Sequence, residues 1–587
     1  MIGATKFLSL GCFHTLLSQN IAICDFHNQI RLALEMSSRH VLDHPSLRCS
    51  LRGKASASTV QFRNLKYASV PARYKDSIPY DSLVGEFDRV FDATQFGPSC
   101  PQLRAAQAWD LTLVGEVTLP CEQGQGKTEQ MDEFECLNLN VTVPKSSLAS
   151  KRKGRPGLPV FVWVHGGGLS MGSNNWPQYD LRRFVERSSE IGKPVIGVAI
   201  NYRHGIYGFL ASEEIGAAGN MGYKDQILAF RWIKRHIAGF GGDPANITAA
   251  GESAGGISLS TLLCADIGEK GLFERVVIMS GEATLRKSSN RQWQRQMLQD
   301  QAKHLGLDIK DVEGRNIALL DTEAEELSQK LPLAQHFAGT VDGKWIRKDV
   351  TLDTLMDGSR VEHKPAWCKE FVTGDAAHDG IVLKARILDH PEALVLLKKA
   401  CKIHLSPSES QRLLAAYKLD GTPSKEEEAD RLREAASELR FYLPSLAVYR
   451  GWKATSPPKR ASRYHFHVPN PIDGIFKGLA SHELDVAYFL QNFNDHFDER
   501  NRKIAQEMAD HFIKFANGEG WVEEGNVVVF GQDGIVKVDE EKYDQVYRGG
   551  RGTVLEGIGA EKLRRLAETW QGVRKEEHES IPKEAKL

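Results

Sequence analysis

Short apolar runs rich in β-branched residues recur along the middle of the chain and constrain its fold more than any other feature. Two of them, residues 160–164 and 194–200, are almost wholly apolar, which is typical of strands buried on both faces of a parallel sheet. A third run, 247–250, follows a segment, 225–233, whose apolar side chains recur at helical spacing. Strand, helix and strand form a βαβ unit. We therefore expect an α/β fold with a large, mostly parallel sheet covered by helices on both faces.

Composition excludes several classes of protein. The 587 residues include 75 basic and 76 acidic side chains, so the net charge of −1 offers no global attraction to nucleic acid. Apolar residues make up 41%, which is too many for a disordered chain. The sequence contains no run of about 18 apolar residues, so we expect no stable membrane insertion. The nine cysteines include no Cys-x-x-Cys pair, which argues against zinc ribbons and redox motifs.

The strongest local motif is Gly251-Glu252-Ser253-Ala254-Gly255, which follows a predicted strand and precedes a stretch of small residues suited to a helix. Gly-x-Ser-x-Gly in this setting predicts a nucleophile elbow, a strand-to-helix turn that exposes a serine hydroxyl. Such a turn is strained and crowded, which explains a glycine on each side of the serine. The alternative is an ordinary glycine-rich turn.

A second glycine motif, His165-Gly166-Gly167-Gly168, comes directly after the predicted strand at 160–164. An oxyanion hole needs backbone N–H groups that converge on one oxygen, and side chains would obstruct that approach. We expect the donors to be the N–H groups of Gly167, Gly168 and Ala254. A flexible turn after a strand is the alternative.

A nucleophilic serine also needs a histidine base and an acid that orients it. In α/β-hydrolases the acid and then the base follow the serine along the chain. Two strand-like runs downstream of Ser253, 371–374 and 464–469, precede loops that carry such residues. Physical reasoning alone leaves several histidines open as the base. The candidates are His378, His465, His467 and His482.

Several blocks in order make the chain resemble the type-B carboxylesterases and lipases, the cholinesterase-like branch of the α/β-hydrolases. The blocks are Glu135-Cys136-Leu137-Asn138-Leu139-Asn140-Val141, the His165 glycine loop, Asn201-Tyr202-Arg203, Gly219-Asn220-Met221-Gly222, Asp225-Gln226, Phe240-Gly241-Gly242-Asp243-Pro244 and the Ser253 motif. The resemblance covers about residues 45–570. It implies a single α/β-hydrolase domain over 42–572, with helical insertions, instead of the several domains that length alone suggests.

The resemblance also implies roles for individual residues. Ser253 matches the nucleophile, Asp379 the acid, where many relatives have glutamate, and His482 the base. Cys100 and Cys136 match a disulfide of the family, which a reducing compartment would leave open.

The expected activity is hydrolysis of a small to medium organic ester through an acyl-enzyme, without a cofactor or a metal. The same triad would also serve an acyltransferase or a thioesterase. A cholinesterase-like protein that binds without catalysis is a further alternative, although the candidate triad is complete. The oligomeric state is not indicated.

The two ends of the chain differ from its centre. Residues 1–41 are expected to be a leader, either poorly ordered or weakly similar to a signal peptide. Residues 573–587 form a charged tail that ends in Ala585-Lys586-Leu587, similar to the Ser-Lys-Leu peroxisomal address. A peroxisomal import receptor is therefore one candidate partner, with a solvated tail as the alternative. We expect an intracellular protein, cytoplasmic or peroxisomal, and keep secretion as the alternative.

Overall fold

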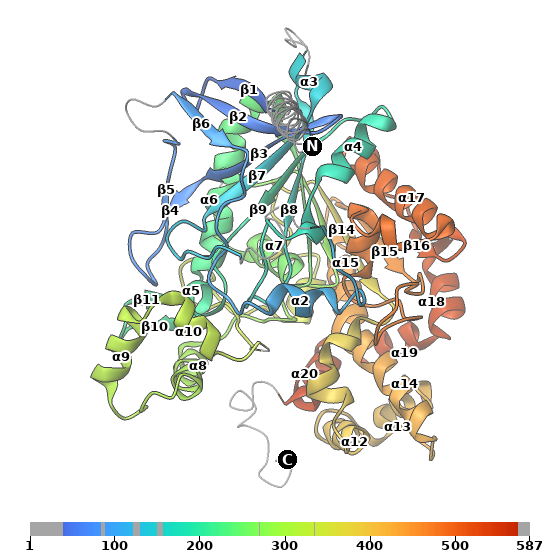
Figure 1. Ribbon diagram of the computed structural model, residues 1–587. Helices are drawn as coiled ribbons and strands as arrows, with labels where there is room; N and C mark the ends of the chain where they lie inside the picture. Colours follow the sequence, from blue (N-terminus) through green and yellow to red (C-terminus); the bar gives the residue numbers. More distant parts are fainter. Residues whose placement is uncertain are drawn as a thin grey trace, which may run out of the picture.

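A computed structural model describes residues 39–83, 89–120, 129–149, 156–268, 270–333 and 335–572 (Figure 1). In this part of the chain, thirteen strands join one sheet in the order β1-β2-β3-β7-β9-β8-β12-β13-β14-β15-β16-β17, with β6 beside β2. The neighbours from β9 to β16 are parallel. The strands are β1 Arg39–His44, β2 Cys49–Ala55, β3 Thr59–Lys66, β4 Ala68–Ser69, β5 Ile78–Pro79, β6 Val90–Ala93, β7 Asn138–Pro144, β8 Leu158–Val164, β9 Ile196–Ile200, β10 Ala211–Ser212, β11 Ala217–Ala218, β12 Gly242–Glu252, β13 Arg275–Met279, β14 Glu370–Ala376, β15 Arg460–Phe466, β16 Asn526–Gly531 and β17 Gly534–Asp539.

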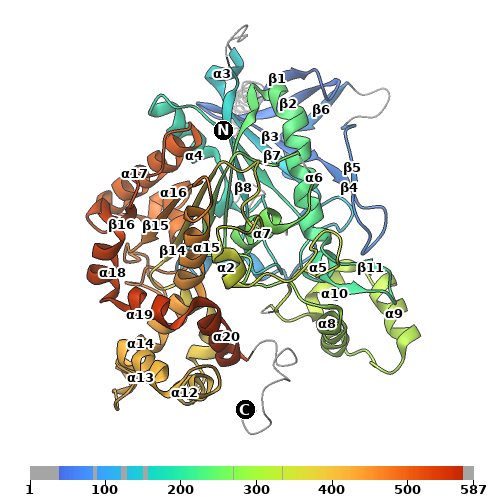
Figure 2. The same ribbon diagram turned by 180° about the vertical axis from the view of Figure 1, so that it is seen from behind.

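Helices cover both faces of this sheet and extend beyond one end of it. Figures 1 and 2 show α8–α10 and α12–α14 as two separate groups of helices near the ends of the central strands. The helices are α2 Ala106–Leu111, α3 Lys145–Ala149, α4 Arg182–Glu190, α5 Gly205–Phe209, α6 Met221–His236, α7 Ala254–Cys264, α8 Arg291–His304, α9 Val312–Asp321, α10 Ala324–Lys330, α11 Leu352–Met356, α12 Ala393–His404, α13 Pro407–Ala416, α14 Lys425–Ser437, α15 Leu443–Lys453, α16 Leu484–Leu490, α17 Glu499–Ala516, α18 Glu540–Arg548, α19 Arg551–Ile558 and α20 Ala560–Gln571. None of the described helices is long and apolar enough to cross a membrane.

Strand β8 shows why its sequence is apolar throughout. Val160, Val162 and Val164 pack into one core. Phe161 and Trp163, which alternate with them, pack into a second core on the other face of the sheet. The Trp163 ring lies 5.4 Å from the ring of Phe489, on α16. Each fully buried side chain of this size stabilises the fold by about 1.5–3 kcal/mol. Both faces of the strand are therefore part of the interior, as expected for a parallel sheet.

The predicted α/β class with a large, mostly parallel sheet is confirmed. The three apolar runs form β8, β9 and part of β12, and the helical segment lies within α6. The first strand begins at Arg39, inside the segment expected to be a leader, while residues 1–38 lie outside the described residues. The tail 573–587, with its peroxisome-like end, also lies outside them.

The parallel arrangement brings distant residues to one edge of the sheet. Strands β8, β12, β14 and β15 run in the same direction, so the loops that follow them emerge at their common carboxyl end. Ligands of open α/β sheets bind at this end of the strands. The glycine motif after β8, the serine motif after β12 and Asp379 after β14 all lie there.

Candidate active site

Ser253 occupies a one-residue turn between β12 and α7. Its backbone has φ 50° and ψ −117°, a conformation that residues with a side chain seldom adopt. Such strain persists only where the surrounding structure enforces it, and it is frequent at functional sites. The hydroxyl-bearing side chain lines a cavity of about 310 Å³.

The two glycines of the serine motif are required by close backbone contacts. A Cβ atom on Gly255 would lie 2.0 Å from the carbonyl oxygen of Val164, at the end of β8. A Cβ atom on Gly251 would lie 2.6 Å from the carbonyl carbon of Gly255. Both distances are far below van der Waals contact, so the turn can form only with glycine at these positions.

Replacing Gly255 with alanine is expected to lower the free energy of unfolding by about 3 kcal/mol, because the added methyl group overlaps immobile backbone. A matched control is Gly557→Ala in α19, where an added Cβ atom meets nothing within 4 Å. That control should raise stability by up to about 1 kcal/mol, since alanine favours helices. Urea unfolding followed by tryptophan fluorescence measures both changes. Equal stability of the two variants would contradict this account of the turn.

The glycine motif after β8 lies beside this turn. Gly167 and Gly168 have φ angles of +96° and +62°, and both line the cavity with Ser253. The carbonyl oxygen of Gly167 accepts hydrogen bonds from the N–H groups of Ser170 and Met171, at 3.0 and 3.1 Å, which hold the loop in a tight turn. Ala254 is the first residue of α7, where helical N–H groups have no partner within the helix. Ala254 thus follows Ser253 in the chain, and Gly167 and Gly168 line the same cavity as Ser253.

Asp379 and His482 are hydrogen-bonded to each other across 103 positions of the chain. The Nδ1 atom of His482 lies 2.6 Å from Oδ1 of Asp379, and both side chains are buried. The second carboxylate oxygen, Oδ2, accepts hydrogen bonds from the Ser280 hydroxyl at 2.9 Å and the Ala376 N–H at 2.8 Å. These bonds fix the carboxylate and, through it, the orientation of the imidazole.

Electrostatics favour the charged form of this imidazole. Burial by itself lowers the pKa of His482, but the hydrogen bond and the negative charge of Asp379 outweigh it and hold the pKa above 6.5. Burial raises the pKa of Asp379, partly offset by the hydrogen bond to His482. The imidazole is therefore a stronger base than a free histidine.

The other candidate histidines have partners elsewhere. His465 is hydrogen-bonded to Asp375, and His467 lies 3.0 Å from the Tyr543 hydroxyl. His378 accepts a hydrogen bond from the Ala480 N–H at 3.0 Å. None of the three is among the described residues that line the cavity, whereas His482 is.

Buried acidic side chains lie near His482, and the sequence analysis assigned them no role. Oε1 of Glu252 is 2.9 Å from Nε2 of His482, although the two atoms are not aligned for a hydrogen bond. The Tyr179 hydroxyl lies 3.2 Å from Glu483 and 3.1 Å from Asp110. Glu252 directly precedes Ser253, and Glu483 directly follows His482. Their positions in the chain could therefore have predicted that both acids lie at the site. No such signal marks Asp110.

These acids hold protons that exposed carboxyl groups would lose. Burial raises the pKa values of Glu252 and Glu483 well above the ordinary range, and that of Asp110 to about 6. The negative charge of Glu252 adds to the effect of burial on the pKa of Glu483, so this pair of acids favours the protonated form. The pair therefore places less negative charge beside the imidazole than two ionised carboxylates would.

The two cysteines expected to form a disulfide are neighbours in the structure. Cys100 and Cys136 are both buried, and each is a free thiol in this structure. The disulfide that the resemblance implies stays a prediction.

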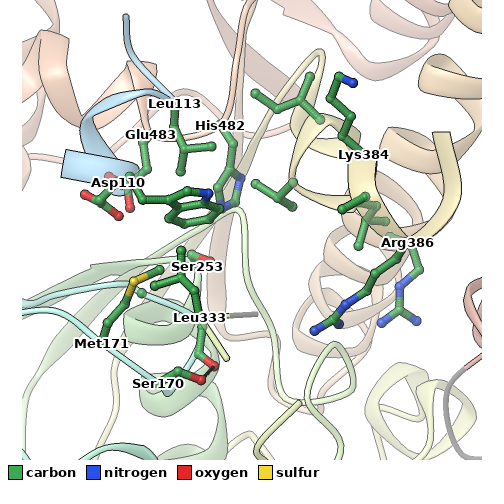
Figure 3. Close-up of a pocket in the computed structure, with 18 of the residues that line it drawn as sticks. Asp110, Leu113, Ser170, Met171, Ser253, Leu333, Lys384, Arg386, His482 and Glu483 are labelled. Atoms are coloured by element: carbon green, nitrogen blue, oxygen red, sulfur yellow. Dashed lines mark hydrogen bonds between the residues drawn. The ribbon is translucent and has the colours of Figure 1, made fainter. Parts of the chain in front are cut away.

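Charges are distributed unevenly around the cavity. Figure 3 shows Asp110 and Glu483 on one side and Lys384 and Arg386 on the other, with Ser253 and His482 between them. Most other lining side chains are apolar. They include Trp109, Leu113, Met171, Ile257, Leu333, Ile381, Phe441 and Phe476.

Comparisons with known proteins relate the chain to esterases and lipases. The sequence model of the "Carboxylesterase family" matches residues 48–530. Lipase 3 of Yarrowia lipolytica is 29% identical over 496 residues, which is 82% of this chain and 89% of that protein. An esterase of Caenorhabditis elegans is 27% identical over 78% of this chain and 82% of its own length. A solved structure of a PNB esterase superposes with a TM-score of 0.65 at 20% identity, over 87% of this chain and 99% of that one.

The structural likeness establishes the α/β-hydrolase fold, and the family match extends over most of the chain. A serine in a strained, glycine-flanked turn at the end of a parallel sheet is what this family requires. The chain thus belongs to the carboxylesterase family, the type-B carboxylesterases and lipases.

Proposed function

We propose that this carboxylesterase hydrolyses small to medium organic esters by covalent catalysis at Ser253, with His482 as the base and Asp379 as the acid that orients it. One observation carries the proposal. Ser253 lies in a strained turn and lines the same cavity as His482. Nδ1 of His482 is 2.6 Å from the carboxylate of the buried Asp379, which leaves Nε2 for the proton of the serine.

The first half of the reaction forms an acyl-enzyme. Nε2 of His482 takes the proton from the Ser253 hydroxyl, and the oxygen attacks the ester carbonyl carbon. The carbonyl electrons move to oxygen, and the N–H groups of Gly167, Gly168 and Ala254 stabilise the resulting oxyanion. The carbon–oxygen bond to the alcohol then breaks, and the alcohol leaves with the proton held by His482.

The second half releases the acid. His482 takes a proton from water, the hydroxide attacks the acyl carbon, and the bond to Ser253 breaks as the serine oxygen regains its proton. Asp379 holds the proton of His482 on Nδ1, so Nε2 is free to accept one at each step. Nε2 of His482 has no hydrogen-bond partner among the described residues. Catalytic hydrogen bonds are often long or misaligned before a substrate binds, and they tighten in the complex.

Covalent labelling tests the assignment of the nucleophile. A fluorophosphonate should attach one equivalent to the native enzyme, and peptide mass mapping should place it on Ser253. The Ser253→Ala variant should take up none. A matched control, Ser258→Ala, removes a buried hydroxyl in α7 that donates to the Ala254 carbonyl, and it should label fully. An unlabelled native enzyme, or full labelling of Ser253→Ala, would refute the proposal.

A further inference from the structure

The cavity wall opposite Asp110 and Glu483 carries a guanidinium group that forms no ion pair with the carboxylates of the described chain. Arg386 is half-buried and lines the cavity. Its polar contact within the described residues is with Nδ1 of His336, at 3.4 Å from Nη1. No carboxylate of the described chain lies within ion-pair distance of it. Burial lowers the pKa of Arg386.

The neighbouring cation shows the contrast. Lys384 lines the same cavity but forms an ion pair with Asp389, which balances its charge. A charge that is partly removed from water and left without a partner is costly to the folded protein. A ligand that supplied an anionic group would recover this cost at Arg386, whereas Lys384 is already compensated.

Arg386 lies only a few residues after Asp379 of the proposed triad, on the same continuous segment of backbone. Asp379 begins a 3-10 turn, Asp379–Leu383, and a single π-helical turn, Lys384–Leu388, follows at once. Single π turns occur frequently at functional sites. This short, continuous segment ties the guanidinium of Arg386 to the acid that orients His482.

A second guanidinium lies nearer the proposed oxyanion donors. Nη2 of Arg286 is 3.5 Å from the position of a Cβ atom on Gly168, and its Nη1 donates to the Gln335 carbonyl at 3.3 Å. Arg386 thus adds positive charge to one side of the cavity, while burial raises the pKa values of the acids on the other side. This asymmetry favours an anionic group on the arginine side.

We propose that the enzyme prefers esters that carry a carboxylate, and that Arg386 determines this preference by pairing with it. A planar guanidinium binds a carboxylate through two parallel hydrogen bonds, which gives both strength and orientation. The apolar remainder of the cavity would hold the hydrocarbon part of the molecule. This inference rests on the proposed ester hydrolysis at Ser253 and adds the class of substrate.

Matched substrates test the preference. One pair places the charge in the acyl group: the 4-nitrophenyl half-ester of adipic acid and its terminal carboxamide. The other places it in the alcohol: 3-carboxyphenyl butyrate and 3-carbamoylphenyl butyrate. The ratio of kcat/KM for the acid to that for its amide should be about 10 to 100 in the native enzyme for at least one pair. It should also fall as ionic strength rises.

Variants assign the preference to Arg386. Arg386→Gln should reduce the ratio by about 10- to 100-fold, as expected for the loss of a charge-assisted pair. Arg386→Lys should retain part of it, and Arg386→Glu should bring it below one. Arg502→Gln removes an equal charge from an exposed site on α17 and should leave the ratio as it is. Circular dichroism checks that each variant is folded. If Arg386→Gln is misfolded, the ratio measured for Arg386→Lys is compared with the native ratio instead, and an unchanged ratio contradicts the inference.

A binding measurement separates this inference from the proposed function. Calorimetric titration of Ser253→Ala with the half-ester and its amide should show tighter binding of the acid, lost when Arg386→Gln is added. If esters are hydrolysed but neither ratio depends on Arg386, the inference about Arg386 is wrong and ester hydrolysis stands. If no ester is hydrolysed yet the acid binds through Arg386, only the proposed function fails. Equal binding of acid and amide would overturn the inference.

Discussion

Replacing Ser253 with alanine is expected to lower kcat/KM for 4-nitrophenyl esters by at least about 10⁴-fold, because the variant loses the oxygen that forms the acyl-enzyme. The remaining rate would come from the oxyanion donors and from substrate binding alone. The fold should persist, since alanine occupies the same strained turn and the flanking glycines are unchanged. Steady-state kinetics and thermal melting measure the two effects separately.

Ser258→Ala is the matched control for this loss. Its hydroxyl donates to the Ala254 carbonyl at 2.7 Å inside α7 and does not line the cavity. Its removal should cost about 1 kcal/mol of stability, as for one buried hydrogen bond, and leave kcat/KM within the same order of magnitude. Activity of Ser253→Ala comparable to that of Ser258→Ala would mean that another group is the nucleophile.

Replacing Asp379 with asparagine should lower kcat by about 10⁴-fold through the wrong tautomer of His482, the effect of the equivalent change in serine proteases. The reason lies in the partners of the carboxylate. Its Oδ2 accepts from the Ala376 N–H at 2.8 Å, and that donor would hold the oxygen of the asparagine amide. The amide NH₂ would then face Nδ1 of His482 and force the ring proton onto Nε2, where it blocks proton uptake from Ser253.

The pH profile distinguishes this effect from simple misfolding. In the native enzyme His482 must be neutral to act, so kcat/KM should fall as the pH drops through a pKa above 6.5. In Asp379→Asn the carboxylate that raises this pKa is gone, so the acid limb of the residual activity should move to lower pH. Asp379→Glu keeps the charge and should keep more activity. An unshifted acid limb in Asp379→Asn would show that Asp379 does not act through His482.

Local features of the site were predictable because their causes are local. The serine turn needs glycine at 251 and 255 to avoid atoms only a few residues away or on the adjacent strand, so the motif itself records the geometry. The apolar runs of β8 and β9 likewise reflect burial on both faces of the sheet. The same holds for the capping box of Ser424 and Glu427 at the start of α14, because its Ser-x-x-Glu spacing is visible in the sequence.

The choice of base and acid was not local. Reasoning from the residues left four histidines open, and only the resemblance to a family selected His482 and Asp379. Their contact depends on the parallel pairing of β14 with β15, which brings the loops after these strands together. No periodicity or spacing in a single sequence encodes that pairing, because the two residues lie on separate segments whose meeting depends on the packing of the whole sheet.

The sequence by itself determined that the chain forms a parallel α/β sheet with a serine turn and a glycine loop, since short-range sterics and strand burial leave direct marks in the order of residues. Only the tertiary structure decided which side chains surround the serine. It brought Glu252, Glu483 and Asp110 together around His482, and it left Arg386 half-buried without a carboxylate in the described chain. Burial and the identity of a charge's neighbours depend on contacts between distant segments, and these contacts set the pKa values and the charge of the cavity.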